Sequence, residues 1–253
     1  TVEGEYSEFH FNTQAPDSFK YDLTDTSFIP DITAPDFVAI TQGGANVRNG
    51  AANYSLPIVV PPAVNNLGPN IGFNYSSRLG NGVMGMGWQV SGFSSIYRCK
   101  PGRETYGSEA TGASKKYETS DRLCFDGTPL LLSASENAPA SDANYWAENA
   151  EYQTEIANFS KIVASGSQGN GHESFVVWLK NGNKLYFGDE SDGQNSRIKQ
   201  PGLNKNEIKR WALDKVEDSY GNLYTIHYEQ DPTISDYRPH YIKYSPEAMV
   251  VFE

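Results

Sequence analysis

The sequence is poor in the features that mark membrane spans, metal centres and nucleic-acid binding. Its 253 residues include only two cysteines and four histidines. No apolar run approaches the ~20 residues that a membrane-spanning helix needs, so no membrane span is expected. Lysine and arginine number 20 against 31 aspartates and glutamates, which gives a net charge of −11. Because such a field repels phosphate backbones and anionic lipid, the composition argues against nucleic acid or a membrane surface as a partner.

Sequence motifs for catalysis and cofactor binding are equally scarce. The four histidines are His10, His172, His227 and His240. None has the spacing of a metal site or a catalytic triad, and His227 is expected to pack across strands. There is no Gly-x-Ser-x-Gly elbow, and the glycines do not follow the dinucleotide-binding order. The sequence therefore predicts no catalytic residue, no cofactor and no metal, and argues against an enzyme.

A short oxygen-rich loop is the only segment that suggests a cation. Asp189, Asp192 and Asn195 surround Gly193. Their spacing is not that of a calcium-binding loop, so a solvated turn is the better interpretation.

The two cysteines, Cys99 and Cys124, both adjoin strand-like segments. A disulfide between them would stabilise the fold by roughly 3 kcal/mol in the loop-entropy model. In a reducing cytosol the same residues would instead be two buried thiols. Both alternatives stay open at this point.

The stretch from Tyr54 to Arg98 organises the chain. The apolar run Leu56–Val60 predicts a strand that stops at Pro61-Pro62, because proline cannot donate to a sheet ladder. Alternation at Ile71, Phe73 and Tyr75 predicts a half-buried strand. Glycines this dense before an aromatic residue indicate tight turns or close backbone approach. They are Gly80, Gly82, Gly85 and Gly87, followed by Trp88.

Downstream, turn signals separate short apolar runs and predict a series of hairpins. Their turns lie at Asp126-Gly127, Asn181-Gly182, Tyr220-Gly221-Asn222 and Ser245-Pro246-Glu247. Both faces of the run Phe175–Leu179 are apolar, which predicts burial on both sides. The segment Tyr152–Ala164 has nearly helical apolar spacing, but no capping box leads into a sustained helical pattern anywhere in the chain.

Several blocks of sequence, in a fixed order, resemble the N-terminal domain of the SpvB / insecticidal toxin-complex B-component family, which is related to Rhs and YD-repeat proteins. They include Tyr54–Ile58, Val60-Pro61-Pro62, Gly80–Trp88, Asp121–Gly127, Tyr152–Ile156, Phe159–Ile162, Trp211–Leu213 and Glu217–Asn222. Asp218, Gly221-Asn222 and Tyr228 also resemble one YD-type repeat unit. The resemblance covers most of the chain from about Ala45 onward, and it favours strands over a helix at 152–164.

The resemblance and the strand pattern together predict an all-β fold. We expect antiparallel sheets packed as a sandwich or rolled layers, with long polar loops and little helix. Residues 1–50, polar and broken by prolines, are predicted to be an extended arm or linker, and residues 51–253 an SpvB-like β domain truncated at its C-terminal end.

The function that the resemblance implies is non-catalytic. Such a domain forms part of a β-rich shell that encloses or presents a toxic module of a secreted bacterial protein. Its partners would be other domains or subunits of a toxin complex, and its location extracellular after synthesis in the cytoplasm.

The alternative is an adhesin-like module that binds a host glycan or receptor through exposed aromatic residues. Trp146, Trp178 and Trp211 are the candidates, together with the tyrosines of the C-terminal strands. Because large aromatic residues also build β cores, we expect these tryptophans to be core residues.

Overall fold

The computed structural model describes residues 11–12, 43–82, 84–99, 117–133, 144–156, 158–199, 207–231, 236–245 and 248–252. Within them the chain is built of antiparallel strands and one short 3-10 turn, η3 (Val64–Asn66), so the all-β prediction is confirmed. No helix in this part is long and apolar enough to cross a membrane. The strands are β1 (Phe11–Asn12), β2 (Gly44–Arg48), β3 (Ala51–Pro57), β4 (Gly72–Ser76), β5 (Asn81–Gly82), β6 (Gly85–Met86), β7 (Trp88–Ser91), β8 (Ser95–Cys99), β9 (Arg122–Phe125), β10 (Thr128–Leu132), β11 (Glu151–Thr154), β12 (Lys161–Ser165), β13 (Ser174–Trp178), β14 (Lys184–Phe187), β15 (Arg197–Lys199), β16 (Ile208–Glu217), β17 (Leu223–Asp231), β18 (Asp236–Ser245) and β19 (Ala248–Val251).

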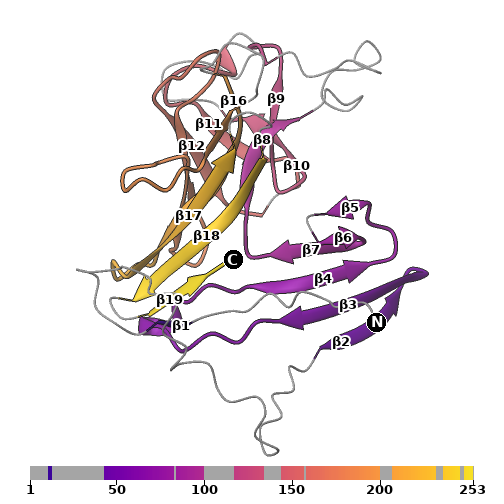
Figure 1. Ribbon diagram of the computed structural model, residues 1–253. Helices are drawn as coiled ribbons and strands as arrows, with labels where there is room; N and C mark the ends of the chain where they lie inside the picture. Colours follow the sequence, from indigo (N-terminus) through magenta and orange to yellow (C-terminus); the bar gives the residue numbers. More distant parts are fainter. Residues whose placement is uncertain are drawn as a thin grey trace, which may run out of the picture.

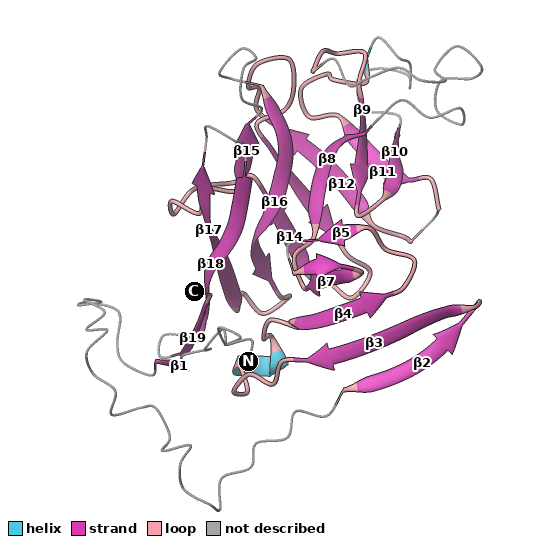
Figure 2. Cartoon of the chain, turned by 45° about the vertical axis from the view of Figure 1, so that its right-hand side comes forward, coloured by secondary structure: helices cyan, strands magenta, loops and turns pink. Residues whose placement is uncertain are grey.

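Eight of these strands close into a ring (Figures 1 and 2). The order is β8-β9-β10-β11-β12-β13-β14-β16, and β16 then pairs with β8 through Arg210 opposite Tyr97 and Trp211 opposite Ile96. Every pairing is antiparallel. Of the architectures expected from the sequence, the rolled layer is therefore the one observed.

Strand β16 belongs to two parts of the sheet. Its first half pairs with β8 and β15, whereas Lys215–Glu217 pair with β17. From β17 the sheet continues outside the ring through β18 and β19 to β1. The ladder between β14 and β16 is irregular at this point: Tyr186 lies opposite Lys215 and Phe187 opposite Leu213. Asp214 is therefore the extra residue of a bulge where the sheet branches.

The interior of the ring is packed with apolar side chains. Phe125 on β9 meets Phe187 on β14, with ring centroids 5.7 Å apart, although these strands are not neighbours. Phe175 packs edge-on against Trp211 at 5.1 Å, and both are fully buried. Contacts between non-adjacent strands are possible only through the interior, so this is the core of the domain.

The outer face of the ring corrects one prediction. Phe175 and Val177 are fully buried, but Trp178 is 37% exposed. Its side chain lies on the outer face, between the neighbours Lys161 and Lys184 in the ladder. The prediction that both faces of Phe175–Leu179 are buried was therefore wrong, because only the inner face of this strand meets a second layer.

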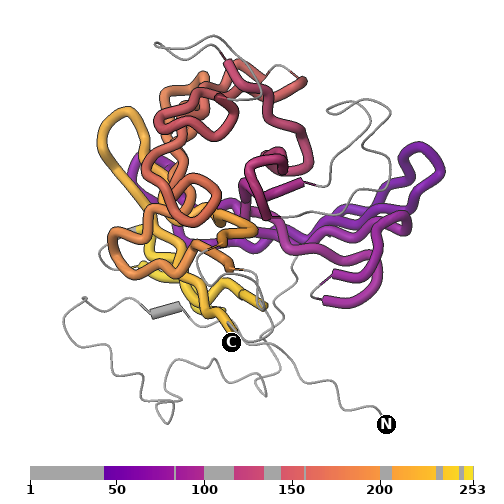
Figure 3. Tube along the Cα trace, turned by 90° about the horizontal axis from the view of Figure 1, so that it is seen from above, coloured from indigo at the N-terminus to yellow at the C-terminus, as the bar shows by residue number. Residues whose placement is uncertain are grey.

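A small four-stranded sheet, β2-β3-β4-β7, lies beside the ring and projects from it (Figures 2 and 3). Asn49 and Gly50, both with positive φ, form the turn between β2 and β3. The strand predicted at 56–60 actually spans Ala51–Pro57, because its first residues pair with β2. Pro61 and Pro62 lie exposed in the connection that follows.

One face of the small sheet carries a row of aromatic residues. Tyr54, Tyr75 and Trp88 lie directly opposite one another on β3, β4 and β7. The Trp88 ring is 5.4 Å from Tyr75 and 6.2 Å from Tyr54. Gly87 has φ +82, and a Cβ there would lie 2.5 Å from the Tyr75 ring. At Gly82 a Cβ would strike the Trp88 carbonyl oxygen, so both glycines allow close packing.

The predicted hairpins are present. Turns join β9 to β10, β13 to β14 and β16 to β17, as the turn signals indicated. Strand β18 pairs with β19, but Pro246 and Glu247 of the turn predicted between them lie outside the described residues. The ambiguous segment 152–164 forms β11 and β12 rather than a helix. The boundary predicted between an arm and a domain at residue 50 stays a prediction, although β2 pairs with β3 across it.

Two tryptophans provide a test of the core. Trp211→Ala should lower the free energy of unfolding by about 3–5 kcal/mol, because it empties a fully buried site. Trp178→Ala, on the outer face of the same ring, should cost less than about 1 kcal/mol. Urea unfolding of both variants measures the difference, and equal losses would contradict the packing described.

Candidate functional site

The largest cluster of buried polar groups surrounds Arg98. This residue lies on β8, two positions after Ile96, so its side chain points into the ring and is fully buried. Its Nε donates to the Ile208 carbonyl at 2.9 Å, and Nη1 donates to the Glu118 carbonyl at 2.9 Å. Nη2 donates to the Asn170 carbonyl at 3.1 Å. One side chain thus joins the segments before β9, β13 and β16.

Two buried carboxylates balance the charge. Asp121 Oδ2 lies 3.5 Å from Nη1 of Arg98, and Glu207 Oε2 lies 3.7 Å from Nη2. Asp121 also accepts from the Tyr117 amide, and Glu207 from the Asn170 amide. Burial lowers the pKa of Arg98, and the two carboxylates oppose that shift. We call these three side chains the arginine clamp.

Aromatic groups cover the clamp. The Arg98 guanidinium lies 4.5 Å from the centre of the Trp146 ring, a cation–π contact. Trp146 donates from Nε1 to the Asp121 carbonyl, which anchors its loop. His172 packs against Trp146, and its Nε2 lies 2.7 Å from the Tyr152 hydroxyl.

The protonation states of this cluster do not suit acid–base catalysis near neutral pH. Burial, helped by the positive charge of Arg98, lowers the pKa of His172 to about 4. Burial also raises the pKa of Tyr152 well above its ordinary value. A general acid or base works best when its pKa is near the working pH, and neither group meets this condition.

Most donors of Arg98 are used. Four of the five N–H groups of the guanidinium donate hydrogen bonds, to three carbonyls and to Asp121, and Nη2 also forms an ion pair with Glu207. An anionic ligand would have to displace one of them. The arrangement is therefore that of a structural clamp rather than a binding site. A charged residue in the inward register of an apolar strand was the signal that sequence reasoning missed.

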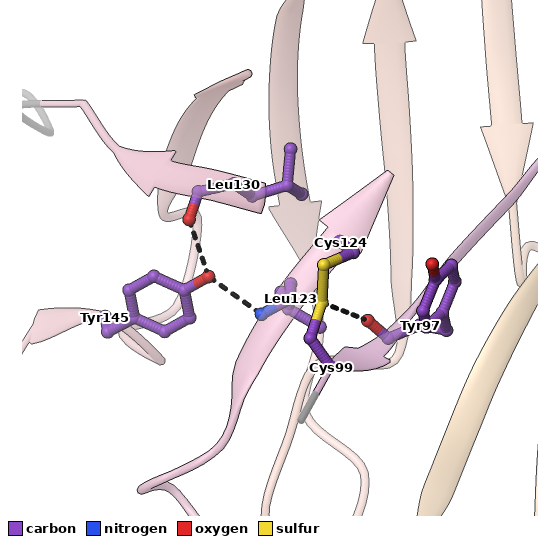
Figure 4. Close-up of a disulfide and its surroundings, with 6 residues drawn as sticks. All are labelled: Tyr97, Cys99, Leu123, Cys124, Leu130 and Tyr145. Atoms are coloured by element: carbon purple, nitrogen blue, oxygen red, sulfur yellow. Dashed lines mark hydrogen bonds between the residues drawn. A yellow bond between two sulfur atoms is a disulfide. The ribbon is translucent and has the colours of Figure 1, made fainter. Parts of the chain in front are cut away.

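Beside the clamp, Cys99 on β8 and Cys124 on β9 form a disulfide (Figure 4). Their Cα atoms are 5.7 Å apart. Next to this bond the Tyr145 hydroxyl donates to the Leu130 carbonyl and accepts from the Leu123 amide. The disulfide thus joins β8, which carries Arg98, to β9, which begins directly after Asp121.

Replacing both cysteines, Cys99→Ser with Cys124→Ser, should lower the free energy of unfolding by about 3 kcal/mol because the unfolded chain gains freedom. Adding dithiothreitol to the unaltered chain should have a similar effect, measured by urea unfolding. The double variant, which has no thiol, is the control and should not respond to reductant. An unfolding midpoint of the unaltered chain that ignores reductant would refute the prediction.

A second polar cluster joins the small sheet to the ring. Asp218, at the turn after β16, accepts from the Tyr220 and Asn222 amides at 2.9 Å. Its Oδ2 accepts from Asn222 Nδ2 and from Asn65 Nδ2, both at 2.8 Å. Asn65 lies in η3, within the connection between β3 and β4. These hydrogen bonds lower the pKa of Asp218 to about 2.

This cluster should make the free energy of unfolding depend on pH in the acidic range. Because the pKa of Asp218 is depressed in the folded state, its contribution is complete above about pH 4 and is lost as pH falls towards about 2. Asp218→Asn should therefore be destabilised relative to the unaltered chain at pH ~6, and the difference should shrink at pH ~2. Urea midpoints at both pH values measure it, with exposed Asp192→Asn as the control. A difference independent of pH would contradict the assignment.

The remaining residues singled out in the sequence do not converge. His227 stacks on Tyr241 at 4.2 Å, the cross-strand packing that was predicted, whereas His10 lies outside the described residues. Asp189 accepts from Lys215 at 2.6 Å, and Asn195 donates to the Tyr228 carbonyl. Across the described ranges, no group of three or more His, Cys, Asp or Glu side chains could hold a metal ion. Of the tryptophans, Trp211 is fully buried and Trp178 is exposed.

The comparisons agree with this architecture. The SpvB family profile, described as Salmonella virulence plasmid 65kDa B protein, matches residues 46–242. The same fold is found in solved structures of a toxin and of an effector protein. The chain is a member of the SpvB family. The search of curated proteins finds no match.

Solved structures with this fold come from toxins and an effector. A crystal structure of TcdB2-TccC3 matches with a TM-score of 0.60 and 17% identity over 82% of this chain. The Photorhabdus luminescens Tc holotoxin pore matches with 0.59 and 17% over 81%. The N-terminal domain of the effector SpvB from Salmonella typhimurium strain LT2 matches with 0.52 and 18% over 75%, covering 64% of that chain. This chain spans only 10% of each Tc chain.

Proposed function

We propose that this chain is a non-catalytic wall domain of a secreted bacterial toxin or virulence protein. It would form part of a β-rich shell that encloses or presents a toxic module. The observation that carries the proposal is the filled interior of the ring. The inward-facing Arg98 is fully buried, donates four hydrogen bonds and pairs with two carboxylates, which supports a role in rigidity rather than a reaction centre.

The continuation of the sheet supports the same role. From β16, the strands β17, β18 and β19 extend the sheet beyond the ring. A wall needs a broad sheet whose strands are joined firmly. The clamp and the disulfide strengthen the connection between β8 and β9. Its partners would be other domains or subunits of a toxin complex, as in the Tc structures that share the fold, and its location extracellular.

Glycan or receptor binding, the alternative, has less support. Trp211 is fully buried, and Trp146 has its ring covered by the Arg98 guanidinium. In the small sheet, the rings of Trp88 and Tyr54 meet at 77°, so they use each other's faces rather than forming a flat platform for a sugar.

The wall can be tested through the clamp. Arg98→Lys keeps the charge but loses the fork that joins three segments, so it should loosen the ring. In the full-length gene product, this variant should expose the enclosed segment to a protease at least about tenfold faster, measured by timed digestion and mass spectrometry. Arg238→Lys is the matched control, because Arg238 is an exposed arginine that pairs only with exposed Glu229.

Two results would contradict the proposal that this chain is a wall domain. One is digestion of the toxic segment at the same rate in the unaltered product and in Arg98→Lys. The other is substrate turnover by the purified 253-residue chain in a broad hydrolase and transferase screen, abolished by His172→Gln at the imidazole that packs against Trp146.

A further inference from the structure

We propose that the free tip of the small sheet binds the surface of an anionic lipid bilayer. This inference goes beyond the wall and rests on different residues. The tip, called the sheet tip below, consists of side chains at the ends of β2 and β4 and on the β5–β6 hairpin. They are Val47, Arg48, Arg78, Leu79, Met84 and Met86.

Apolar side chains of the sheet tip are exposed. Val47 is 78% exposed, Met86 76%, Met84 48% and Leu79 37%. Single exposed apolar residues are common on soluble proteins, but a group of them on one projection marks a binding surface.

Hydrogen bonds hold the segments that carry these residues at one end of the small sheet. The Ser77 amide donates to the Ala52 carbonyl, and the Ala52 amide donates to Ser77 Oγ, so the end of β4 lies against the start of β3. Nη2 of Arg78 donates to the Asn49 carbonyl in the β2–β3 turn. The Gly87 amide donates to the Gly80 carbonyl, which brings the β5–β6 hairpin to the same end. Figures 1 and 3 show this end projecting away from the ring.

The charge of this region differs from that of the chain. From Phe37 to Arg103 the sequence has no aspartate or glutamate, although the whole chain has 31. Arg48 and Arg78 are both exposed, and neither has a carboxylate partner among the described residues. Surface charges are screened beyond about 8–10 Å, so an approaching surface would meet the local cations before the acidic ring. The net charge alone had argued against a membrane surface, but the local charge favours one.

The shape and the side chains favour a bilayer over a protein pocket. The tip is a projection, and Met86 pairs with Asn81 within the β5–β6 hairpin. Behind the tip, Trp88, Tyr75 and Tyr54 form the half-buried aromatic row. Interfacial segments commonly meet a bilayer in this order: apolar residues enter first, and aromatic rings and arginines lie at the level of the lipid headgroups.

Vesicle sedimentation tests the proposal. The 253-residue chain should bind vesicles of two parts phosphatidylcholine to one part phosphatidylglycerol, and bind pure phosphatidylcholine more weakly. Arg48→Glu with Arg78→Glu should reduce binding to the anionic vesicles about 25-fold or more, since each lost cation is worth about fivefold. Met84→Ser with Met86→Ser should reduce it at least about tenfold.

A control double variant and a soluble anion as competitor complete the experiment. Ile156→Ser with Phe159→Ser removes side chains that are 76% and 82% exposed on the ring, and should leave binding unchanged. Inorganic phosphate should not compete, because the apolar contacts need a bilayer. Circular dichroism confirms that each variant is folded.

Three outcomes would overturn the proposal. Binding to anionic vesicles could be absent in the unaltered chain or undiminished in both tip variants, and either result contradicts a bilayer contact at the tip. Competition by inorganic phosphate would point to a free anion. Self-association lost in Met84→Ser with Met86→Ser, seen by analytical ultracentrifugation without vesicle binding, would make a second copy the occupant. None of these results bears on protease protection of a toxic segment, so the two proposals fail separately.

Discussion

The pairing of β16 with β8 is the constraint on which the rest of the fold depends. It places Trp211 opposite Ile96 and turns both side chains into the ring, where they are fully buried. A slip of one residue would turn this set of side chains towards solvent. The bond from Arg98 Nε to the Ile208 carbonyl joins the same two strands from the inside. Ring closure and the buried charge therefore support each other, because the guanidinium finds its acceptors only when the register is correct.

The same strand explains why the sheet branches. At Asp214 one edge of β16 changes from pairing with β8 to pairing with β17. The bulge turns the carboxylate so that Oδ2 accepts from the Asp189 amide and from Ser196 Oγ, each at 2.6 Å. Its other oxygen has no hydrogen-bond partner among the described residues, and burial raises the pKa of Asp214 to about 7. A buried acid with a raised pKa costs stability at high pH, so the branch is retained at some cost to stability.

Local features were predictable from the sequence, and long-range ones were not. The turns at Asp126-Gly127 and Asn181-Gly182 follow from backbone preferences of a few residues, and the apolar runs beside them fix the strands. Ring closure joins Tyr97 to Arg210, and no local pattern encodes this pairing. Trp178 was misassigned for a related reason: strand alternation gives two faces, but only tertiary structure decides which face meets another layer. The clamp was missed because its acceptors are mostly backbone carbonyls, which carry no sequence signal.

The distribution of contacts separates stability from recognition. The ring is held by a disulfide, by the arginine clamp and by a core of buried apolar side chains. The small sheet is attached more simply, through its apolar connection and the bond from Asn65 to Asp218. Its aromatic row and exposed tip contribute little to closing the ring. Substitutions in the small sheet are therefore expected to leave the ring closed.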